Sequence, residues 1–252
     1  MDRVAFTIFG IDIMWYALII ASGLAIGIVL SVKESRRIGF NEDTLFDLLL
    51  AVIITGIICA RLYYVVFSPD EINSFYDVIN IRSGGMAIHG GVFGGIVAGI
   101  IGCKIKKISF WQLADILMPP VILAQAIGRW GNFVNQEVYG GQTNLPWGIS
   151  IDNLPGKYHP LFLYESLCNL ITFVFLVWYR KNKRKNEGEV FALYLVFYGI
   201  VRFFLERMRV EEYILKFMSF SIAQIVSALI FIAGIVIFYI LRKHKNKSKD
   251  LN

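Results

Sequence analysis

A short polar segment at residues 128–140 carries side chains of the kind that can hold an anion. Its sequence is Gly-Arg-Trp-Gly-Asn-Phe-Val-Asn-Gln-Glu-Val-Tyr-Gly, and it follows directly on a long apolar run. Fixed polar groups at the margin of a membrane are costly and often mark functional sites. The candidate binding residues of this segment are Arg129, Asn132, Asn135, Glu137 and Gly140.

Arg129 also has a structural interpretation. A long basic side chain near the end of a membrane helix can reach the interface, and Arg129 can also pair with Glu137. The glycines at 128, 131 and 140 predict tight turns or close backbone approach instead. We therefore favour a binding loop for this segment.

A second arginine lies in the segment Tyr198-Gly-Ile-Val-Arg-Phe-Phe-Leu-Glu-Arg-Met-Arg209. Tyr198, Arg202, Glu206 and Arg209 recur at helical spacing, so one helix face carries all four. Arg202 and Glu206 can form a purely internal ion pair. Alternatively, Arg202 faces a cavity and Glu206 holds its rotamer.

His89 is the only histidine within the apolar runs, where an ionisable group needs a partner or water. Histidine can accept a proton near neutral pH, so His89 is a candidate general base. The glycines at 91, 95 and 99 that follow it predict close helix packing. Tyr16, Tyr164 and Glu165 are weaker candidates, with core, interfacial or helix-start roles as alternatives.

Two guanidinium groups at the margin of a bilayer favour phosphate as their ligand, because the planar fork binds two phosphate oxygens at once. The phosphate found at that depth is a phospholipid headgroup. With a histidine as base, this set predicts transfer of a group from a phospholipid to an acceptor that loses a proton.

The composition indicates a polytopic membrane protein. Hydrophobic residues make up 56% of the 252 positions and charged residues only 17%, which leaves too few polar residues for the surface of a soluble domain. The net charge of +6 lies in short blocks between apolar runs, so we expect no nucleic-acid partner. The three cysteines have no paired spacing, which argues against a disulfide framework or a zinc site.

The expected fold is all-α, with seven transmembrane helices in a single domain of residues 1–252. About 20 apolar residues cross the hydrocarbon layer. The runs of that length cover residues 12–32, 44–67, 86–103, 110–128, 160–179, 189–206 and 219–241. Asp47, Arg61 and Asp115 lie in or near these runs, and we interpret them as interhelical polar contacts.

Most of the basic residues fall in alternate loops, which predicts an N-terminus outside and a C-terminus inside. The basic blocks are 33–37, 104–107, 180–185 and a cytoplasmic tail at about 242–252. With this orientation, a small extracytoplasmic domain is formed by residues 129–159 between the fourth and fifth helices. The candidate site residues then gather at the outer margin of the membrane.

These segments resemble the motifs of a known family. The run "GRWGNFVNQEVYG", the "HGG" at His89, the "YGIVRFFLERMR" of 198–209 and the "HPLFLYES" of 159–166 are similar to the signatures of the prolipoprotein diacylglyceryl transferases. Ala17 departs from the glycine usual in that family, and Val-Glu-Glu after Arg209 departs from its usual aspartate.

The resemblance implies a transferase that begins lipoprotein maturation. Such an enzyme moves the sn-1,2-diacylglyceryl group of phosphatidylglycerol onto the thiol of the lipobox cysteine in a prolipoprotein signal peptide, forms a thioether and releases glycerol 1-phosphate. It lies in the bacterial cytoplasmic membrane, with its active site on the extracytoplasmic side, and no metal or other cofactor is expected.

The resemblance also implies roles for the residues. Either His89, or Tyr198 with help from Arg202, takes the thiol proton, and Arg129 and Arg202 neutralise the leaving phosphate. Asn132, Asn135 and Glu137 shape the headgroup pocket or hold Arg129. The further residues expected to bind substrate are Tyr16, Gly140 and Glu206.

Two other classes of protein were weighed. A transporter predicts inverted repeats and interrupted helices that place polar groups at the midplane, and the sequence shows neither. An intramembrane protease predicts paired aspartates, a His-Glu-x-x-His zinc motif or a serine elbow, and these are missing as well.

Overall fold

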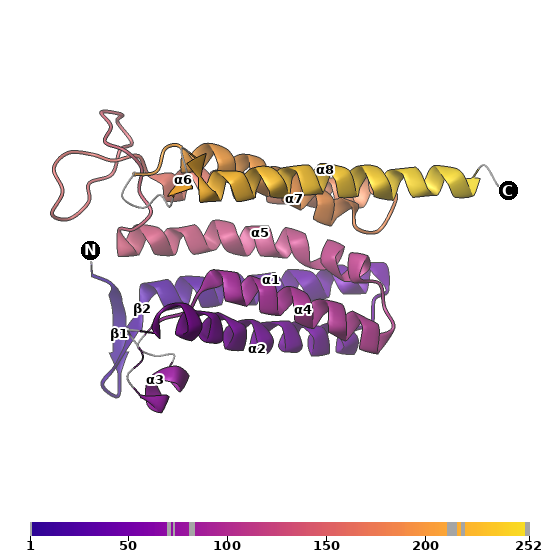
Figure 1. Cartoon of the computed structure of the whole chain (residues 1–252), viewed down its shortest axis with the longest axis horizontal. Coiled ribbons are helices and arrows are strands. Elements are labelled where there is room, and N and C mark those ends of the chain that lie inside the picture. Colours follow the sequence, from indigo (N-terminus) through magenta and orange to yellow (C-terminus); the bar gives the residue numbers. More distant parts are fainter. Residues whose placement is uncertain are drawn as a thin grey trace. The chain divides into compact units, whose positions relative to one another are not determined.

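A computed structural model describes residues 2–69, 72, 74–80, 84–210, 216–217 and 220–249, and these are mostly α-helical (Figure 1). The helices are α1 (Trp15–Ile38), α2 (Glu42–Phe67), α3 (Phe75–Ile79), α4 (Ile88–Lys106), α5 (Phe110–Asn135), α6 (Leu161–Asn182), α7 (Glu189–Glu206) and α8 (Ile222–Lys249). The strands are β1 (Val4–Ile8), β2 (Ile11–Met14), β3 (Lys216–Phe217) and β4 (Phe220–Ser221). Glu211 and Glu212, which depart from the family pattern, lie outside the described residues.

Within the described part of the chain, six helices are long and apolar enough to cross a membrane, namely α1, α2, α4, α5, α6 and the part of α8 up to Lys243. The chain is therefore a polytopic membrane protein of the all-α class. α7 has the bounds expected for the sixth span, residues 189–206, but it is not among these six. α7 carries three charged residues, Glu189, Arg202 and Glu206, in its 18 positions, so a count of seven spans stays a prediction.

α5 extends further than expected, because it continues through Asn135 instead of ending at 128. The tight turns expected at Gly128 and Gly131 are therefore wrong, since both glycines are helical. Close approach explains them instead: a Cβ on Gly131 would lie 2.6 Å from the ring of Tyr16, and one on Gly128 would lie 3.2 Å from Ile20. These glycines let α1 pack closely against α5.

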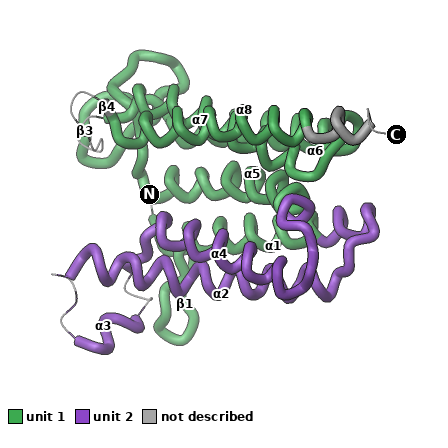
Figure 2. The backbone as a smooth tube through the Cα atoms, turned by 45° about the vertical axis from the view of Figure 1, so that its right-hand side comes forward, with its two compact units in different colours: residues 1–31, 114–252 green, residues 32–113 purple. Residues whose placement is uncertain are grey.

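The chain divides into two compact units, residues 1–31 with 114–252 and residues 32–113 (Figure 2). In the smaller unit, α2 packs against α4 through glycines on α4. A Cβ on Gly94 would meet Cys59 Cβ at 2.5 Å, and one on Gly90 would meet the Cys59 carbonyl more closely still. α4 thus approaches α2 closely at Gly90 and Gly94. The predicted packing glycines lie one residue later, and two of them, Gly91 and Gly95, make only ordinary contacts.

All three predicted interhelical polar contacts are confirmed. Asp47 on α2 pairs with Lys106 on α4 at 2.5 Å, and Asp115 on α5 accepts hydrogen bonds from the backbone of Gly188 and Phe191 at the start of α7. Arg61 on α2 donates to the Asp77 and Val78 carbonyls of α3, and it also donates to the Gly84 and Gly85 carbonyls, each at 2.6 Å.

The larger unit contains α5, α6, α7 and α8 around a buried apolar cluster. Its fully buried members are Ile122, Leu176, Tyr179 and Val190, contributed by α5, α6 and α7, and Phe238 of α8 packs against them. Between α5 and α6 the chain runs through residues 136–160, which are partly extended: Tyr158 bridges both Gln142 and Ile149. This segment is the part of the predicted 129–159 insertion that lies outside the helices.

Candidate active site

Arg129 is held by a carboxylate of the neighbouring helix. Its Nη2 lies 2.5 Å from Oε1 of Glu165 on α6, and its Nη1 donates to Asn132 Oδ1 at 3.4 Å. The Glu165 side chain is 5% exposed, whereas that of Arg129 is 25% exposed. The alternative expectation that Arg129 pairs with Glu137 is therefore wrong. A buried carboxylate needs a cationic or hydrogen-bonding partner, so the ion pair with Glu165 holds the Arg129 side chain in place.

Glu137 instead gathers the two asparagines. Its Oε1 accepts hydrogen bonds from Asn132 Nδ2 at 2.8 Å and from Asn135 Nδ2 at 3.4 Å. The turn that presents it is unusual, because Gln136 and Val138 on either side have φ of 54° and 57°. A β-branched residue in the left-handed region is strained, and such strain collects at functional sites.

Gly140 links this turn to the end of α7. Its backbone bridges Arg209, and its N–H donates to the His159 carbonyl at 2.9 Å. A Cβ at this position would lie 2.7 Å from the Met208 carbonyl oxygen, so only glycine fits without a backbone shift. The segment that presents Glu137 is thereby attached to the segment that follows Arg202.

Arg202 forms the second arginine cluster. Its Nη2 lies 3.0 Å from Oε2 of Glu206, and Arg209 Nη1 lies 3.6 Å from the same oxygen. Glu206 is buried, and its other oxygen accepts from Ser221 Oγ at 3.2 Å. The ion pair expected from the helical spacing is present. It leaves 21% of the Arg202 side chain exposed, so the guanidinium is neither sealed in the interior nor fully solvated.

Tyr198 lies one turn before Arg202 on α7. Its ring stacks on that of Tyr194 at 5.8 Å, and the Tyr194 hydroxyl accepts a hydrogen bond from Gln125 Nε2 of α5 at 3.0 Å. Tyr16, by contrast, packs its ring over the backbone at Gly131 on α5, two residues from Arg129. Tyr198 thus lies near Arg202 on α7, and Tyr16 lies near Arg129 on α5.

His89 lies in the first turn of α4, in the smaller unit. Its side chain is exposed, and its ring centroid is 6.2 Å from that of Tyr63 on α2. Arg61 anchors the segment just before α4 by donating to the Gly84 and Gly85 carbonyls. His89 is therefore on a positioned helix start, but it does not belong to the unit that contains the two arginines.

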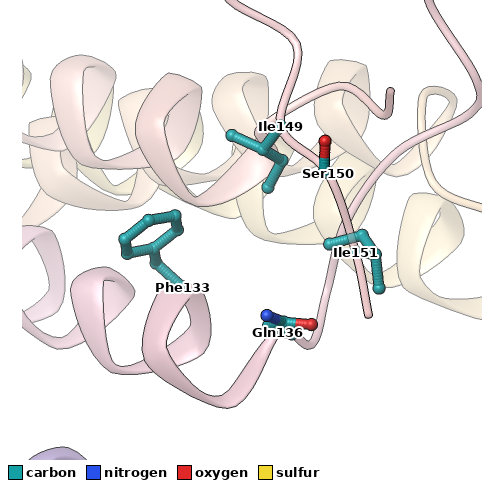
Figure 3. Close-up of a pocket in the computed structure, with 5 residues that line it drawn as sticks. All are labelled: Phe133, Gln136, Ile149, Ser150 and Ile151. Carbon is teal, nitrogen blue, oxygen red and sulfur yellow. The ribbon is translucent and has the colours of Figure 1, made fainter. Parts of the chain in front are cut away.

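The segment after Glu137 contains a polar cluster and a pocket. The Tyr164 hydroxyl accepts from Trp147 Nε1 at 2.8 Å and lies 3.2 Å from His159 Nδ1. A pocket of about 210 Å³ separates the end of α5 from residues 149–151, as Figure 3 shows, with Phe133 and Gln136 on the helix side. Gln136 Oε1 accepts from the Asp152 backbone at 2.7 Å and so fixes this segment against α5.

The structure brings most of the expected residues into one unit. Arg129, Asn132, Asn135, Glu137 and Gly140 form one continuous set, and Arg202, Glu206 and Arg209 form the set attached to it through Gly140. Glu165 was a weaker candidate from the sequence alone, with no partner predicted for it. A carboxylate early in an apolar helix calls for a cation, and this signal pointed to Arg129.

Comparison with known proteins gives one consistent match. Residues 3–240 match the family model described as prolipoprotein diacylglyceryl transferase. A phosphatidylglycerol–prolipoprotein diacylglyceryl transferase of Clostridioides difficile is 47% identical over 252 residues, covering 99% of this chain and 100% of the relative. Proteins of the same name from Finegoldia magna and Enterococcus faecalis are 43% and 42% identical, and the alignments cover 99% and 98% of this chain.

Proposed function

Because this chain belongs to the prolipoprotein diacylglyceryl transferase family, we propose that it transfers the sn-1,2-diacylglyceryl group of phosphatidylglycerol to a prolipoprotein. The acceptor is the thiol of the lipobox cysteine in the signal peptide. The products are a thioether-linked diacylglyceryl protein and glycerol 1-phosphate, and the reaction is the first step of lipoprotein maturation.

One observation carries the assignment of the site: the C-terminal parts of α5 and α7 each hold an arginine that is tethered by a buried glutamate and is partly exposed. Arg129 is tethered by Glu165 and Arg202 by Glu206. A guanidinium has five N–H donors, so a single carboxylate leaves donors for a further anion. Such preorganised arginines suit a phosphate that gains charge as it leaves.

The chemical step is a displacement at the glycerol carbon that carries the phosphate ester. The cysteine thiol loses its proton, and the thiolate sulfur forms a bond to that carbon. The C–O bond to the phosphate breaks, and its electron pair leaves with glycerol 1-phosphate. Arg129 and Arg202 bind the phosphate oxygens, where negative charge increases during the reaction.

His89 is proposed as the base that takes the thiol proton. Imidazole accepts a proton near neutral pH, and His89 is exposed at the start of α4 on a segment that Arg61 anchors. His89→Asn should lower turnover by at least about 10²-fold, the usual range for a lost general base. If His89→Asn keeps most of its activity and Tyr198→Phe loses it, Tyr198 is the base instead.

The proposed topology has seven spans, with the N-terminus outside and the active site on the extracytoplasmic side. Two features support it. α7 has the length of a short span, with its charges near its ends, and the Lys and Arg blocks fall between alternate helices. The 136–160 segment and the ends of α5 and α7 that carry the arginines then face the outside together.

The direct test combines the purified full-length chain with phosphatidylglycerol and a lipobox peptide. Mass spectrometry should detect a peptide heavier by one diacylglyceryl group, together with free glycerol 1-phosphate. A matched peptide with serine in place of the lipobox cysteine should remain unmodified. The proposal is wrong if the cysteine peptide gains no diacylglyceryl group while the protein is folded and the lipid is present.

A further inference from the structure

A buried amide on α6 lies one turn deeper than the Arg129 tether. Asn169 follows Glu165 by four residues on the same helix face and is 2% exposed, and its Nδ2 has no hydrogen-bond partner among the described residues. An unpaired polar group in an apolar interior costs stability, so it is retained where a ligand can pair with it.

The facing helix has a similar group at the corresponding depth. Gln125 lies one turn before Arg129 on α5; its Nε2 donates to Tyr194, but its Oε1 is buried and unpaired. Ser166 Oγ donates to the Ala126 carbonyl at 2.9 Å, so this stretch of α6 packs directly on this stretch of α5. Asn169 and Gln125 thus form a polar layer beneath the arginine layer and above the apolar cluster around Ile122 and Leu176.

The depth of this layer matches the chemistry of a diacyl phospholipid. In such a lipid, the two ester carbonyls are separated from the phosphate by the glycerol carbons. One helical turn is about 5 Å, so a lipid whose phosphate contacts Arg129 reaches the Asn169 layer with its ester groups. An ester carbonyl oxygen is an acceptor only, and the amide N–H of Asn169 is a donor without an acceptor.

We propose that Asn169 forms a subsite for an ester carbonyl of the lipid substrate, so that the enzyme selects diacyl over dialkyl phospholipids. This inference rests on the proposed function and specifies the lipid class that the same site accepts. Asn169 donates through Nδ2 to one ester carbonyl. A dialkyl ether lipid has no carbonyl oxygen there, so the amide stays unpaired when that lipid binds.

The test is a competition in one vessel. The purified full-length chain receives a lipobox peptide and equal amounts of diester and diether phosphatidylglycerol with the same chain length. Mass spectrometry separates the two thioether products. The wild-type chain should use the diester lipid about tenfold faster, the effect of one buried hydrogen bond. Asn169→Leu should bring the ratio close to one by slowing use of the diester.

Thr172→Val is the matched control. Thr172 lies three residues further along the same buried face, is 4% exposed, and its hydroxyl already donates to the Cys168 carbonyl at 2.8 Å. This variant should keep the wild-type ratio. If Asn169→Leu does not accumulate in membranes, Asn169→Ala removes the amide without branching and should give the same readout.

The outcomes separate the two proposals. A wild-type ratio near one, or a wild-type ratio that survives loss of the Asn169 amide, overturns the ester subsite and leaves the transferase reaction intact. No adduct from the diester lipid with the wild-type chain overturns both. A variant that merely disturbs packing slows both lipids equally, so an unchanged ratio with a lower rate also counts against the subsite.

Discussion

The two ends of α5 hold charge in opposite ways. Asp115 near the start and Arg129 near the end are 14 residues apart, about 20 Å along the helix. Asp115 is fully buried and accepts from the Gly188 and Phe191 backbone at 2.9 and 3.0 Å, with Arg184 at 3.3 Å. Both carboxylate oxygens of Asp115 therefore accept hydrogen bonds.

The neighbouring carboxylate at that end is also satisfied. Glu189 is fully buried and accepts from the Tyr179 hydroxyl at 2.7 Å, from the Lys185 backbone at 3.1 Å and from Asn186 Nδ2 at 3.1 Å. Arg242 of α8 lies 3.3 Å from it. This cluster ties α6, α7 and α8 together, and nothing in it needs a ligand.

The Arg129 end differs in how many partners its buried carboxylate has, because the arginines keep exposed surface at both ends. Among the described residues, Arg129 is the only hydrogen-bond or ion-pair partner of Glu165, whereas Asp115 and Glu189 each have at least three. A saturated network specifies packing, whereas a tethered cation with donors to spare is preorganised for an anion. The same residue types therefore serve structure at one end of α5 and binding at the other.

The largest expected effect comes from removing the tethered cations. Arg129→Ala and Arg202→Ala should each lower turnover by about 10³-fold, because the leaving phosphate loses a preorganised donor. Turnover is measured by adduct formation per folded molecule. Normalising to folded protein is needed because each substitution takes a cation from a buried glutamate, and near-normal turnover per folded molecule in either variant would erase the contrast between the two ends.

A smaller loss of turnover is expected when the positive charge is kept but the planar guanidinium is removed. Arg129→Lys should lower turnover by about 10²-fold, because an ammonium is a point charge that cannot bind a phosphate and Glu165 in the planar arginine geometry. The measurement is the same adduct assay with a titration of phosphatidylglycerol. Wild-type rates for this variant would show that charge alone, without bidentate contact, is sufficient.

Removing the tether should cost less than removing the arginine. Glu165→Gln keeps the shape of the side chain but not its charge, so Arg129 stays and loses its fixed position; we expect about a tenfold loss of turnover. Glu137→Gln is the matched control at the exposed carboxylate, because it keeps an oxygen acceptor for Asn132. If both substitutions have equal effects, Glu165 has no special role in positioning Arg129.

The smallest effect on turnover is expected at the saturated end. Asp115→Asn should lower the free energy of unfolding by about 1–3 kcal/mol, because it leaves buried donors poorly paired. It should leave turnover per folded molecule within about twofold of wild type, since Asp115 contacts no substrate. Thermal unfolding in detergent and the adduct assay measure the two quantities separately. A large loss of turnover at unchanged stability would contradict the assignment.

Much of the fold followed from local sequence patterns. Apolar runs of membrane length predicted every long helix, since the interior of a bilayer requires internally satisfied backbone. The end of α5 was misplaced because Gly128 and Gly131 read as turn formers. They are helical because α1 approaches there, with Ile20 and Tyr16 against them, and that approach depends on contacts between distant residues.

The sequence by itself determined the membrane class, the candidate residues and the ion pair of Arg202 with Glu206, because hydropathy and helical spacing are local properties. Tertiary structure decided that Arg129 pairs with Glu165 and that the buried Asn169 Nδ2 has no partner among the described residues. Both depend on how α6 packs on α5. Side chains far apart along the chain meet only when helices dock, and the docking decides which buried polar groups find partners and which remain for a ligand.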